Sequence, residues 1–472
     1  MASQPPLGAL PQILRCPFCD GRFSFEERPT PPFGRAEFGL LRCSCSVFPV
    51  VDGIPIIQRG PVGMLEHTRG TQQTESVSIN TLVAQVERGD TSNALLNCLA
   101  VPESQGAWRS AIGWRLAHSR FASRIARALG NRKFRRHVLA RRDTLGAREV
   151  LEFYYLSGGP LDPAMGHYFV RRFGQPRHLA ALSLAATMAS DAKPILDIAC
   201  GIGHLEHYFG CRHDPAPVVG LDMNYYHLWI ARHWMAPDAH FVCANADDGL
   251  PFADDSFAST VCSDAYHYIR NRRRLLDEIE RCAVGRMVVL TRVGNAAVMP
   301  NEGAESTLAD YLAEFGSAEV HAFDEAELLR RYLRRIDAFS PGPVRRDDLS
   351  ESKWLSFAWN LLNRSKRSIA SDAIAPHAVG QVGVNPIYSH EAGADGSLRL
   401  SFTFPMIWYA YENHAMLSYH PRVAILSPDE LANLAAWNSR ETLRTLVDSF
   451  VLLGLPHRFT QTDSSSASSS KS

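Results

Sequence analysis

A turn with two glycines follows a short apolar run near the middle of the 472-residue chain. The segment Ile195-Leu-Asp-Ile-Ala-Cys-Gly-Ile-Gly-His-Leu-Glu-His207 orders a predicted strand, the turn and the start of a helix. Gly201 and Gly203 lack a Cβ atom, so they can adopt positive φ angles and let the backbone approach a ligand closely. The helix that follows offers free N–H groups. The pattern indicates a nucleotide-type ligand, but such turns occur in many α/β proteins.

A second predicted strand ends in a carboxylate that suits a ribose. Val218-Val-Gly-Leu-Asp222 places Asp222 downstream of Asp197, where its carboxylate can accept hydrogen bonds from both ribose hydroxyls. A dinucleotide enzyme would carry a third glycine where this sequence has Glu206. The combination therefore argues against a nicotinamide cofactor.

Four cysteines near the start of the chain have the spacing of metal ligands. Cys16 and Cys19 form a Cys-x-x-Cys pair, and Cys43 and Cys45 form a Cys-x-Cys pair. Four thiolates suit tetrahedral zinc, and an ion with four protein ligands has no open position, so its role would be to fold the module. Because the second pair is not the commoner Cys-x-x-Cys, buried thiols that bind no metal are the alternative.

A second set of cysteine and histidine residues has metal-like spacing, but we interpret it as ordinary packing. Its members are Cys200, His204, His207, Cys211 and His213. Cys200 belongs to the glycine turn, and the next two histidines fall on the helix after it. Surface or core histidines are the interpretation we favour over a metal site here.

The segment from Tyr168 to Arg292 resembles class I methyltransferases in three blocks that agree in order and spacing. The blocks are Asp197–Gly203, Gly220–Met223 and Cys243–Phe257, the last of which contains Leu-Pro-Phe and Ser-Phe. The resemblance implies S-adenosylmethionine as the cofactor. It also implies an α/β fold with a Rossmann-like domain built on a mostly parallel seven-stranded sheet.

The resemblance further implies a set of cofactor contacts. Asp197 would meet the methionine amino group, Asp222 the ribose hydroxyls and Met223 the adenine. Asn245 stands where an aspartate usually accepts the adenine amino group, and its carbonyl can still accept that bond. The remaining predicted cofactor-binding residues are Ala199, which replaces the usual first glycine, Gly201, Gly203, Ala246 and Ser263.

The cysteine module resembles the small zinc-ribbon partner proteins that activate tRNA and translation-factor methyltransferases. The resemblance lies in Leu14–Cys19, in Leu41–Cys43 and in the Phe-Pro-x-x-Asp-Gly-Ile-Pro run of Phe48–Ile56. It implies that the four cysteines hold a structural zinc ion. It also implies that the module buttresses the catalytic domain within the same chain.

The acceptor is expected beside the end of the fourth predicted strand, because ligands of open α/β sheets bind at the carboxyl ends of strands. There the sequence reads Cys262-Ser-Asp-Ala-Tyr-His-Tyr268. Methyl transfer needs a base only if the nucleophile must lose a proton, and histidine titrates near neutral pH. His267 and Tyr266 are the predicted catalytic residues, with Asp264 a weaker candidate; a packed histidine at a helix start is the alternative for His267.

Two further observations favour a small-molecule acceptor. Gly166–Phe173 resembles the helix that covers the cofactor in many small-molecule methyltransferases, with Tyr168 and Arg172 near the methionine end. The Asn/Asp-Pro-Pro-Tyr/Phe run of methyltransferases that act on planar amide or adenine nitrogens is absent from the sequence. We therefore expect transfer to an O or N nucleophile of a secondary metabolite or glycan precursor.

A basic stretch keeps RNA as the alternative substrate. Arg115–Arg148 holds eleven Lys and Arg residues against the single acid Asp143, and Arg132, Arg135 and Arg136 could neutralise phosphates. A solvated helix face is the competing interpretation of this stretch. A non-catalytic scaffold that binds the cofactor is the third function, left open by the departures from the family motifs.

The chain divides into five predicted regions. They are a zinc-ribbon-like module at 10–60, a linker and helical region at 61–165, the methyltransferase domain at 166–300, an α+β accessory region at 301–460 and a serine-rich tail at 461–472, expected to be disordered. The predicted strands are Ile195–Ala199, Val218–Asp222, Phe241–Ala244, Ser259–Ser263 and Met287–Thr291. Helix-compatible stretches separate them, which predicts a parallel sheet covered on both faces. In the accessory region we expect a helix at Asp324–Ile336 and a strand within Leu398–Tyr411.

Charge and composition exclude a general attraction to polyanions. Lys plus Arg equals Asp plus Glu at 49 each, so any charged partner must meet a local patch. The chain shows no secretory leader and no apolar run long enough to span a bilayer, which predicts a cytoplasmic protein without membrane contact. Five aromatic residues after Asn301 could wall a pocket, mediate a homodimer or belong to the core: Trp354, Trp359, Trp408, Tyr409 and Tyr411.

Overall fold

The computed structural model describes ten segments of the chain. These are residues 10–28, 38–63, 76–99, 134–156, 163–189, 193–300, 306–316, 319–341, 346–361 and 374–459. The predicted tail at 461–472 lies outside them, and so does the first part of the basic stretch, including Arg132.

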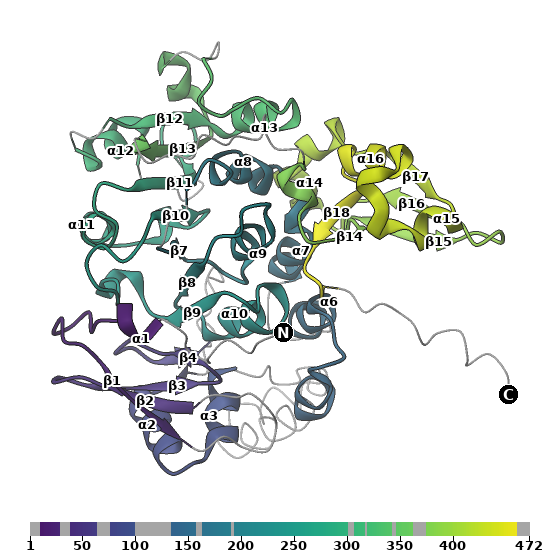
Figure 1. The fold of residues 1–472 in the computed structure, drawn as a ribbon. Helices are drawn as coiled ribbons and strands as arrows, with labels where there is room; N and C mark the ends of the chain where they lie inside the picture. Colours follow the sequence, from purple (N-terminus) through teal and green to yellow (C-terminus); the bar gives the residue numbers. More distant parts are fainter. Residues whose placement is uncertain are drawn as a thin grey trace, which may run out of the picture.

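A seven-stranded sheet forms the centre of the molecule (Figure 1). In spatial order its strands are β12 (His321–Asp324), β13 (Trp354–Trp359), β11 (Met287–Gly294), β10 (Ser259–Ser263), β7 (Ile195–Ile198), β8 (Val218–Asp222) and β9 (His240–Cys243). Each neighbouring pair is parallel except the two pairs that contain β13. The predicted Rossmann-like, mostly parallel sheet is confirmed.

Burial on both faces explains the apolar character of these strands. Every residue of β7 and of β11 is buried, and strands covered on both sides lose the alternation of polar and apolar residues. All five predicted strands are present, and each begins within one residue of its predicted start. The chain order reverses at β7, which pairs with β8 on one side and β10 on the other. Ligands of open α/β sheets bind at such a reversal.

Helices cover both faces of the sheet (Figure 1). One face carries α7 (Pro163–Arg171), α8 (Pro176–Ala185), α9 (His204–Cys211), α10 (Tyr225–Ile230) and α13 (Glu325–Leu333); the other carries α11 (Arg272–Cys282) and α12 (Leu308–Glu314). All ten residues of α8 are buried, because this helix packs between β11 and α13. Its polar side chains must therefore find partners inside the protein.

The start of the chain folds as a small antiparallel sheet. Its strands are β1 (Ser24–Arg28), β2 (Phe38–Arg42), β3 (Val47–Val51) and β4 (Ile54–Pro55), preceded by α1 (Leu10–Ile13) and packed against α2 (Ile79–Glu87) and α3 (Thr91–Cys98). Beside it, β5 (Val62–Gly63) pairs with β6 (Ser76–Val77), and α6 (Ala147–Leu151) leads toward α7. Asp52 and Gly53 join β3 to β4 with φ angles of 47° and 73°, as two-residue hairpin turns require.

This module continues the central sheet beyond β9 (Figure 1). Ile56 forms a parallel bridge with Cys243, and the Ile57 N–H donates to the Cys243 carbonyl at 2.8 Å. Leu14 forms an antiparallel bridge with Phe252. The backbone of the module thereby covers the outer edge of β9, which would otherwise present unpaired polar groups.

Asp52 fixes the module on the segment that contains α10. Its carboxylate is 2% exposed and accepts hydrogen bonds from the Trp229 indole and the His233 ring, each at 2.8 Å. The Arg142 guanidinium lies 3.9 Å away. Burial alone would raise the pKa of Asp52, but His233, Arg142 and the Trp229 bond outweigh it and lower the pKa to about 2.

The C-terminal region combines short strands and helices. They are β14 (Gln381–Val384), β15 (Tyr388–Ala392), β16 (Leu398–Phe402), α14 (Ile407–Glu412), β17 (Val423–Leu426), α15 (Pro428–Ala432), α16 (Glu441–Asp448) and β18 (Leu452–Leu455). β14 pairs with β18, and β15, β16 and β17 form a second sheet. The predicted helix over Asp324–Ile336 is present as α13.

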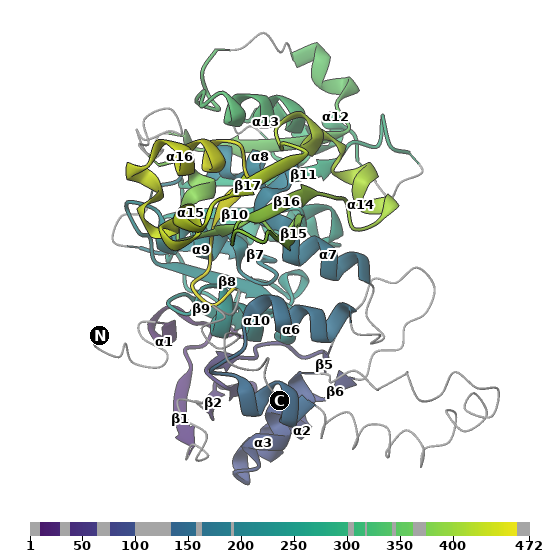
Figure 2. The ribbon, with the colours of Figure 1, turned by 90° about the vertical axis from the view of Figure 1, so that its right-hand side faces the viewer.

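The expected strand within Leu398–Tyr411 ends at Phe402, and α14 begins at Ile407. Helical spacing buries Tyr409 and leaves Trp408 and Tyr411 exposed. Figure 2 shows α14 beside α7. The Gln175 side-chain amide just after α7 donates to the Tyr409 hydroxyl at 3.1 Å, which attaches the C-terminal region to the methyltransferase sheet. None of the described helices has both the length and the apolar character needed to cross a membrane.

Replacing Asp52 by Asn tests the joint between the module and the sheet. The Asp52→Asn variant keeps the side-chain volume but loses two charge-assisted contacts in a buried site, so we expect the free energy of unfolding at pH 7 to fall by about 2 kcal/mol. Because the folded pKa is lowered, the difference should shrink as pH falls from about 4 toward 2, where the carboxylate becomes protonated in both states. Urea denaturation measures both effects. The exposed Glu27→Gln change on β1 is the control, and equal stability of Asp52→Asn and native protein contradicts the assigned role.

Candidate cofactor site and metal centre

The turn between β7 and α9 is shaped by three residues with positive φ. Ala199, Gly201 and Gly203 have φ angles of 59°, 57° and 87°. A Cβ atom on Gly203 would lie 3.0 Å from the Cβ of Ala231, so the helix that follows β8 packs directly on the glycine. The left-handed backbone and the close packing together explain why the sequence places glycine at two of these positions.

Asp222 supports this turn from the end of β8. One carboxylate oxygen accepts the Gly201 N–H at 3.0 Å, and the other accepts the Asn224 N–H at 2.8 Å. Both bonds orient the carboxylate at the carboxyl ends of β7 and β8. The structure therefore brings the Asp222 carboxylate, which is predicted to bind the ribose, into direct contact with the predicted glycine turn.

Asp197 lies under the turn with a second acid that the sequence analysis did not select as a site residue. Asp197 is 2% exposed and Glu206, in the first turn of α9, is 1% exposed. Burial raises the pKa of Asp197 to about 8, with Arg172 opposing and Asp222 adding to the shift. Burial also raises the pKa of Glu206 well above its ordinary value, with Asp197 the next contributor. The sequence analysis missed Glu206 as a site residue, because there it appeared only as the residue that replaces the third glycine of dinucleotide-binding enzymes.

The predicted adenine side follows β8 and β9. Met223 and Asn245 are partly exposed, and Ala246 is buried. The Asn245 side-chain carbonyl already accepts the Asp247 N–H at 3.0 Å, where it caps a short turn. The Cys243 thiol donates to the Met223 carbonyl at 3.6 Å, so the two loops are joined.

On the other side of β7, Asp264 directly follows β10 and is surrounded by basic residues. Its carboxylate accepts a hydrogen bond from the Tyr168 hydroxyl at 3.0 Å and lies 3.4 Å from Arg172 and 3.3 Å from Arg177. Arg292, at the end of β11, approaches the other carboxylate oxygen to 3.2 Å. Burial would raise the pKa of Asp264, but the three guanidinium groups hold it below its ordinary value.

Two more acids complete what we name the ion cluster. Arg292 pairs with Glu325 of α13 at 2.6 Å and with Glu412 of α14 at 2.8 Å, and Arg177 pairs with Glu412 at 3.2 Å. The Arg292 guanidinium also stacks 3.9 Å from the centre of the Trp354 ring. The members of the ion cluster are Arg172, Arg177, Arg292, Asp264, Glu325 and Glu412.

The sequence analysis selected only Arg172 and Asp264 from this cluster. The other four members come from three helices and a strand that are far apart in the chain, and no local spacing joins them. One signal was available, because Arg292 is the one charged residue in a buried strand. A buried arginine requires acidic partners, although it does not say which ones.

The two predicted catalytic residues occupy different environments. Tyr266 is fully buried, and its hydroxyl donates to Glu314 of α12 at 3.0 Å, so this phenol holds a packing contact. The His267 ring lies 6.3 Å from Trp354 and 4.1 Å from Tyr268, centre to centre. Its buried Nδ1 has no hydrogen-bond partner among the described residues. Burial lowers the pKa of His267, Asp264 opposes the shift, and Arg292 and Arg177 add to it.

The four N-terminal cysteines form a compact cluster. Their sulfur atoms all lie within 4.8 Å of one another, and Cys45 is 3.6 Å from both Cys16 and Cys43. A tetrahedral zinc ion with Zn–S bonds of about 2.3 Å needs sulfur atoms about 3.8 Å apart. None of the four forms a disulfide. Both the donor type and the spacing fit one zinc ion.

The second cysteine and histidine set has other contacts. His204 hydrogen-bonds the Phe169 carbonyl at 3.1 Å, and His207 hydrogen-bonds the Val379 carbonyl at 3.3 Å. Both rings are buried. They join α9 to the segments that pack over it.

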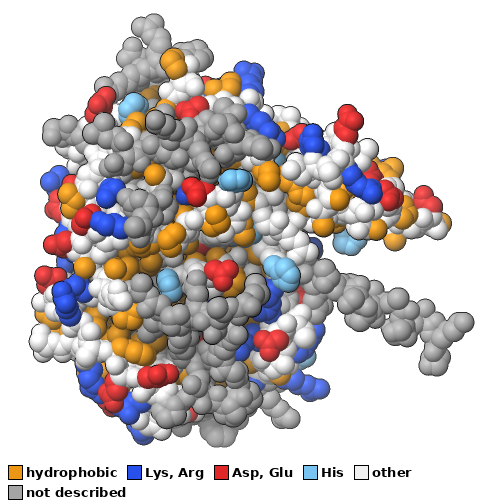
Figure 3. Space-filling view, in the orientation of Figure 1, with side chains coloured by type: hydrophobic (Ala, Val, Ile, Leu, Met, Phe, Trp, Pro, Cys, Tyr) orange, Lys and Arg blue, Asp and Glu red, His pale blue; other side chains and the backbone are white. Residues whose placement is uncertain are grey.

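The described part of the basic stretch also has protein partners. Arg135 donates to the Asn93 side chain at 3.3 Å, and Arg142 faces Asp52. Arg136 is exposed. On the face shown in Figure 3, basic and acidic side chains are interspersed. Arg132 lies outside the described residues.

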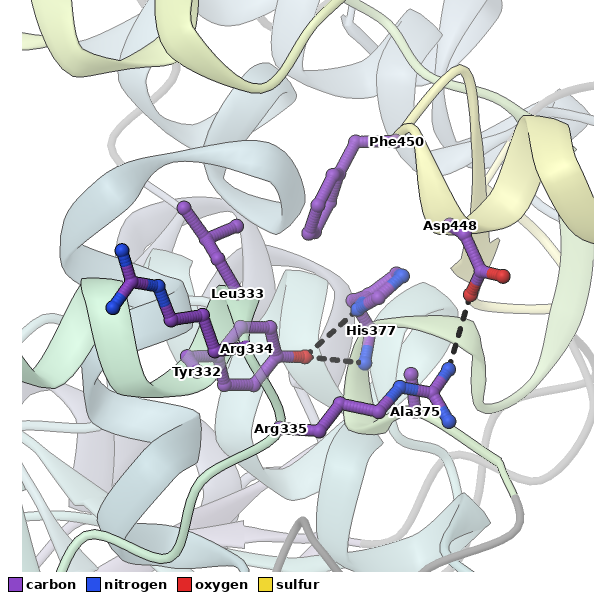
Figure 4. Close-up of a pocket in the computed structure, with 8 residues that line it drawn as sticks. All are labelled: Tyr332, Leu333, Arg334, Arg335, Ala375, His377, Asp448 and Phe450. Atoms are coloured by element: carbon purple, nitrogen blue, oxygen red, sulfur yellow. Dashed lines mark hydrogen bonds and ion pairs between the residues drawn. The ribbon is translucent and has the colours of Figure 1, made fainter.

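A cavity of about 250 Å³ lies away from the glycine turn, between the end of α13 and the C-terminal region (Figure 4). Polar side chains that line this cavity form hydrogen bonds and an ion pair with one another. The Tyr332 hydroxyl lies 2.9 Å from the His377 Nδ1 and accepts the His377 N–H at 3.0 Å, and Arg335 pairs with Asp448 at 3.0 Å. These contacts hold α13 against the end of α16.

Residues 195–284 match a family described as a methyltransferase domain. No curated protein matches the chain in sequence. Many solved structures are similar over part of the chain, and three serve as examples. The Haloferax volcanii Trm112 methyltransferase activator in complex with its proposed methyltransferase is 18% identical and covers 40% of this chain and 93% of that one, with a TM-score of 0.31.

A methyltransferase from Mesorhizobium loti that depends on S-adenosylmethionine is 16% identical, covering 39% of this chain and 98% of that one, with a TM-score of 0.29. Phosphoethanolamine N-methyltransferase 2 of Haemonchus contortus, in complex with S-adenosyl-L-methionine, is 16% identical, covering 46% of this chain and 60% of that one, with a TM-score of 0.31. The family match and the strand order lead to one assignment. The chain contains a methyltransferase domain that includes residues 195–284 and is built on a Rossmann-like, mostly parallel sheet, and its N-terminal four-cysteine cluster fits a zinc ribbon.

Proposed function

We propose that the protein transfers a methyl group to an O or N nucleophile of a small molecule, in a crevice over the carboxyl ends of β7, β8 and β10. The observation that carries this proposal is the glycine turn held by Asp222 beside the ion cluster. The bound cofactor would supply a methyl carbon already activated by its sulfonium. The protein then has to hold the cofactor, orient the acceptor and exclude water.

The residues present fit that cofactor. The Asp222 carboxylate is fixed at the turn, where it can accept the ribose hydroxyls, and Asp197 offers a buried acid for the amino group. Met223, Asn245 and Ala246 would border the adenine. Ala199, Gly201, Gly203 and Ser263 complete the proposed contacts along the strand ends.

Backbone strain gathers at the same edge of the sheet. Ala199, Asp264 and Arg292 have φ angles of 59°, 61° and 53°. The first two directly follow the strands β7 and β10, and Arg292 lies within the neighbouring strand β11, where its pairing with β13 is irregular. Left-handed conformations of residues other than glycine cost free energy and are concentrated at functional sites. Their alignment supports an acceptor site over β10 and β11.

The C-terminal region supports a small acceptor. Glu412 of α14 reaches the strand ends through Arg292 and Arg177, so this region closes over the acceptor side. Tyr268 and Tyr411 are 62% and 67% exposed, and they offer apolar surface near the ion cluster. The match of residues 195–284 to methyltransferase domains favours an enzyme over a non-catalytic scaffold.

Asp222→Ala tests the cofactor site. The change removes the proposed ribose contacts and the support of the glycine turn, each a charge-assisted bond worth about 1.5–3 kcal/mol. We expect the Kd for S-adenosylhomocysteine, measured by calorimetry, to rise by about 100-fold. The exposed Asp277→Ala change on α11 is the control. Unchanged affinity in Asp222→Ala contradicts the proposed site.

His267→Ala tests the proposed base. Loss of a general base lowers rates by about 10²–10⁴-fold, whereas binding of S-adenosylhomocysteine should not change. Because the pKa of His267 is lowered, the native ring is neutral at pH 7, and activity should fall only when acid protonates it. The measurement is methyl transfer from labelled cofactor to the acceptor fraction of a host extract, followed from pH 5 to pH 8. A variant with the native rate and pH profile excludes His267 as the base.

Cys45→Ser tests the metal centre. We expect one zinc per native chain by mass spectrometry and less than half of that in the variant, together with a lower Tm, because a structural zinc ion stabilises the fold that binds it. Cys211→Ser is the control, since Cys211 lies outside the cluster. Native protein that is purified with added zinc and still contains none would contradict a zinc centre.

A further inference from the structure

The buried carboxyl group of Glu206 has no role in the contacts described above. It projects from the first turn of α9 and is 1% exposed, and neither of its oxygens has a hydrogen-bond partner among the described residues. A buried polar group without a partner costs free energy, so its retention calls for an explanation. An acid in the first turn of a helix gains from the helix dipole, but that gain is small compared with the cost of burial.

The neighbouring strand leaves room for this carboxyl group. A Cβ atom on Gly220 of β8 would lie 2.6 Å from Glu206 Oε1 and 2.8 Å from the Cys200 sulfur. Gly220 has ordinary strand geometry, so glycine is needed here for the space that it leaves and not for a turn. The carboxyl group therefore occupies a cradle between β8 and the glycine turn.

Asp197 lies beside this cradle, because it is the register partner of Gly220 on the neighbouring strand β7. It is 2% exposed, and its Oδ1 also has no hydrogen-bond partner among the described residues. The ionisable groups that act on the two acids are Arg172, Asp222, Cys200 and the acids themselves. Arg172 is the one cation in that set, and it is also engaged by Asp264 and by the Ser263 hydroxyl.

We propose that Asp197 and Glu206 form a paired acid that holds one proton in the free protein and releases it to solvent when the ammonium group of the cofactor binds. Two neighbouring buried carboxyl groups with one shared cation are more stable with a proton between them. An ammonium group brought to Asp197 adds the positive charge that lets both acids ionise. Glu206 is then a positioning residue of the cofactor site, acting through Asp197. This inference rests on the proposed function.

The pH dependence of binding follows from this linkage. The pKa of Asp197 is raised to about 8 and that of Glu206 is raised well above its ordinary value, so the pair holds a proton in the free protein at neutral pH. Binding of a cation favours the ionised pair, and affinity should therefore increase with pH. One released proton makes the Kd fall about tenfold for each unit of pH below the pKa of the pair. Between pH 6 and 7.5 the amino group of the ligand is itself charged, so this window isolates the pair.

Calorimetry with S-adenosylhomocysteine, on the full chain loaded with zinc, tests the inference. Titrations at pH 7.4 in phosphate and in Tris compare buffers that take up a proton with very different heats. We expect the difference between the two observed heats to equal the heat of protonating the buffer with about one proton for each ligand bound. We also expect the Kd to fall about tenfold per pH unit between pH 6 and 7.5.

Glu206→Gln is the decisive variant, because it keeps the shape of the side chain and removes the shared proton. It should bind S-adenosylhomocysteine with equal heats in both buffers and with an affinity that no longer depends on pH. Its Tm and zinc content report whether it folds. The control Glu280→Gln, exposed on α11, should release the same proton as the native protein.

Three outcomes would overturn the inference. Native protein that binds the ligand with equal heats in both buffers contradicts the inference alone and leaves the proposed function intact. A folded Glu206→Gln variant that still releases one proton places the proton elsewhere. Native protein that shows no binding in either buffer contradicts the proposed function, and the paired acid falls with it.

Discussion

The carboxylate of Asp222 holds the backbone turn on which the cofactor site depends. Its two oxygens accept N–H groups from the glycine turn and from the start of the segment after β8, so the ends of two parallel strands share one anchor. A turn with three positive φ angles is a strained shape, and strain persists only where the surroundings enforce it. Because the chain's own carboxylate supplies this support, the shape of the turn does not depend on contacts from the cofactor.

The ion cluster imposes a second constraint at the other end of the proposed crevice. Its three arginines and three acids balance in charge; the arginines are buried and the acids are only slightly exposed. Such clusters are not strong sources of stability, but removing one member leaves an unpaired buried charge, which costs about 3–5 kcal/mol. The cluster therefore fixes where α13 and α14 stand relative to β10 and β11. This tie also holds Asp264 and Arg292 in their left-handed conformations.

Local signals in the sequence were sufficient for the sheet, the glycine turn and the cysteine cluster. Each depends on residues within a few positions of one another, so strand spacing, the two glycines and the cysteine pairs could be recognised directly. The ion cluster and the cradle of Glu206 depend on contacts between distant segments, and no periodicity encodes them. The aromatic segment after Leu398 shows a related limit, because short runs of aromatic residues suit a strand and a buried helix face equally. The contacts of α14 with α7 and the bond from Gln175 to the Tyr409 hydroxyl join distant segments and favour the helix. Tyr266 illustrates the same point, because only the fold shows that its hydroxyl meets Glu314.

The two accessory parts of the chain contact opposite ends of the proposed crevice. The N-terminal module is small, so packing against the neighbouring sheet adds to its stability, and the proposed zinc ion would add more. Its backbone pairs with Cys243, two residues before Asn245, and the Cys243 thiol contacts the Met223 carbonyl. Loss of the module would therefore disturb the loops that carry Met223 and Asn245, on the proposed adenine side. The C-terminal region reaches the proposed acceptor side through Glu412. Each addition therefore contacts loops at one end of the proposed site on the central sheet.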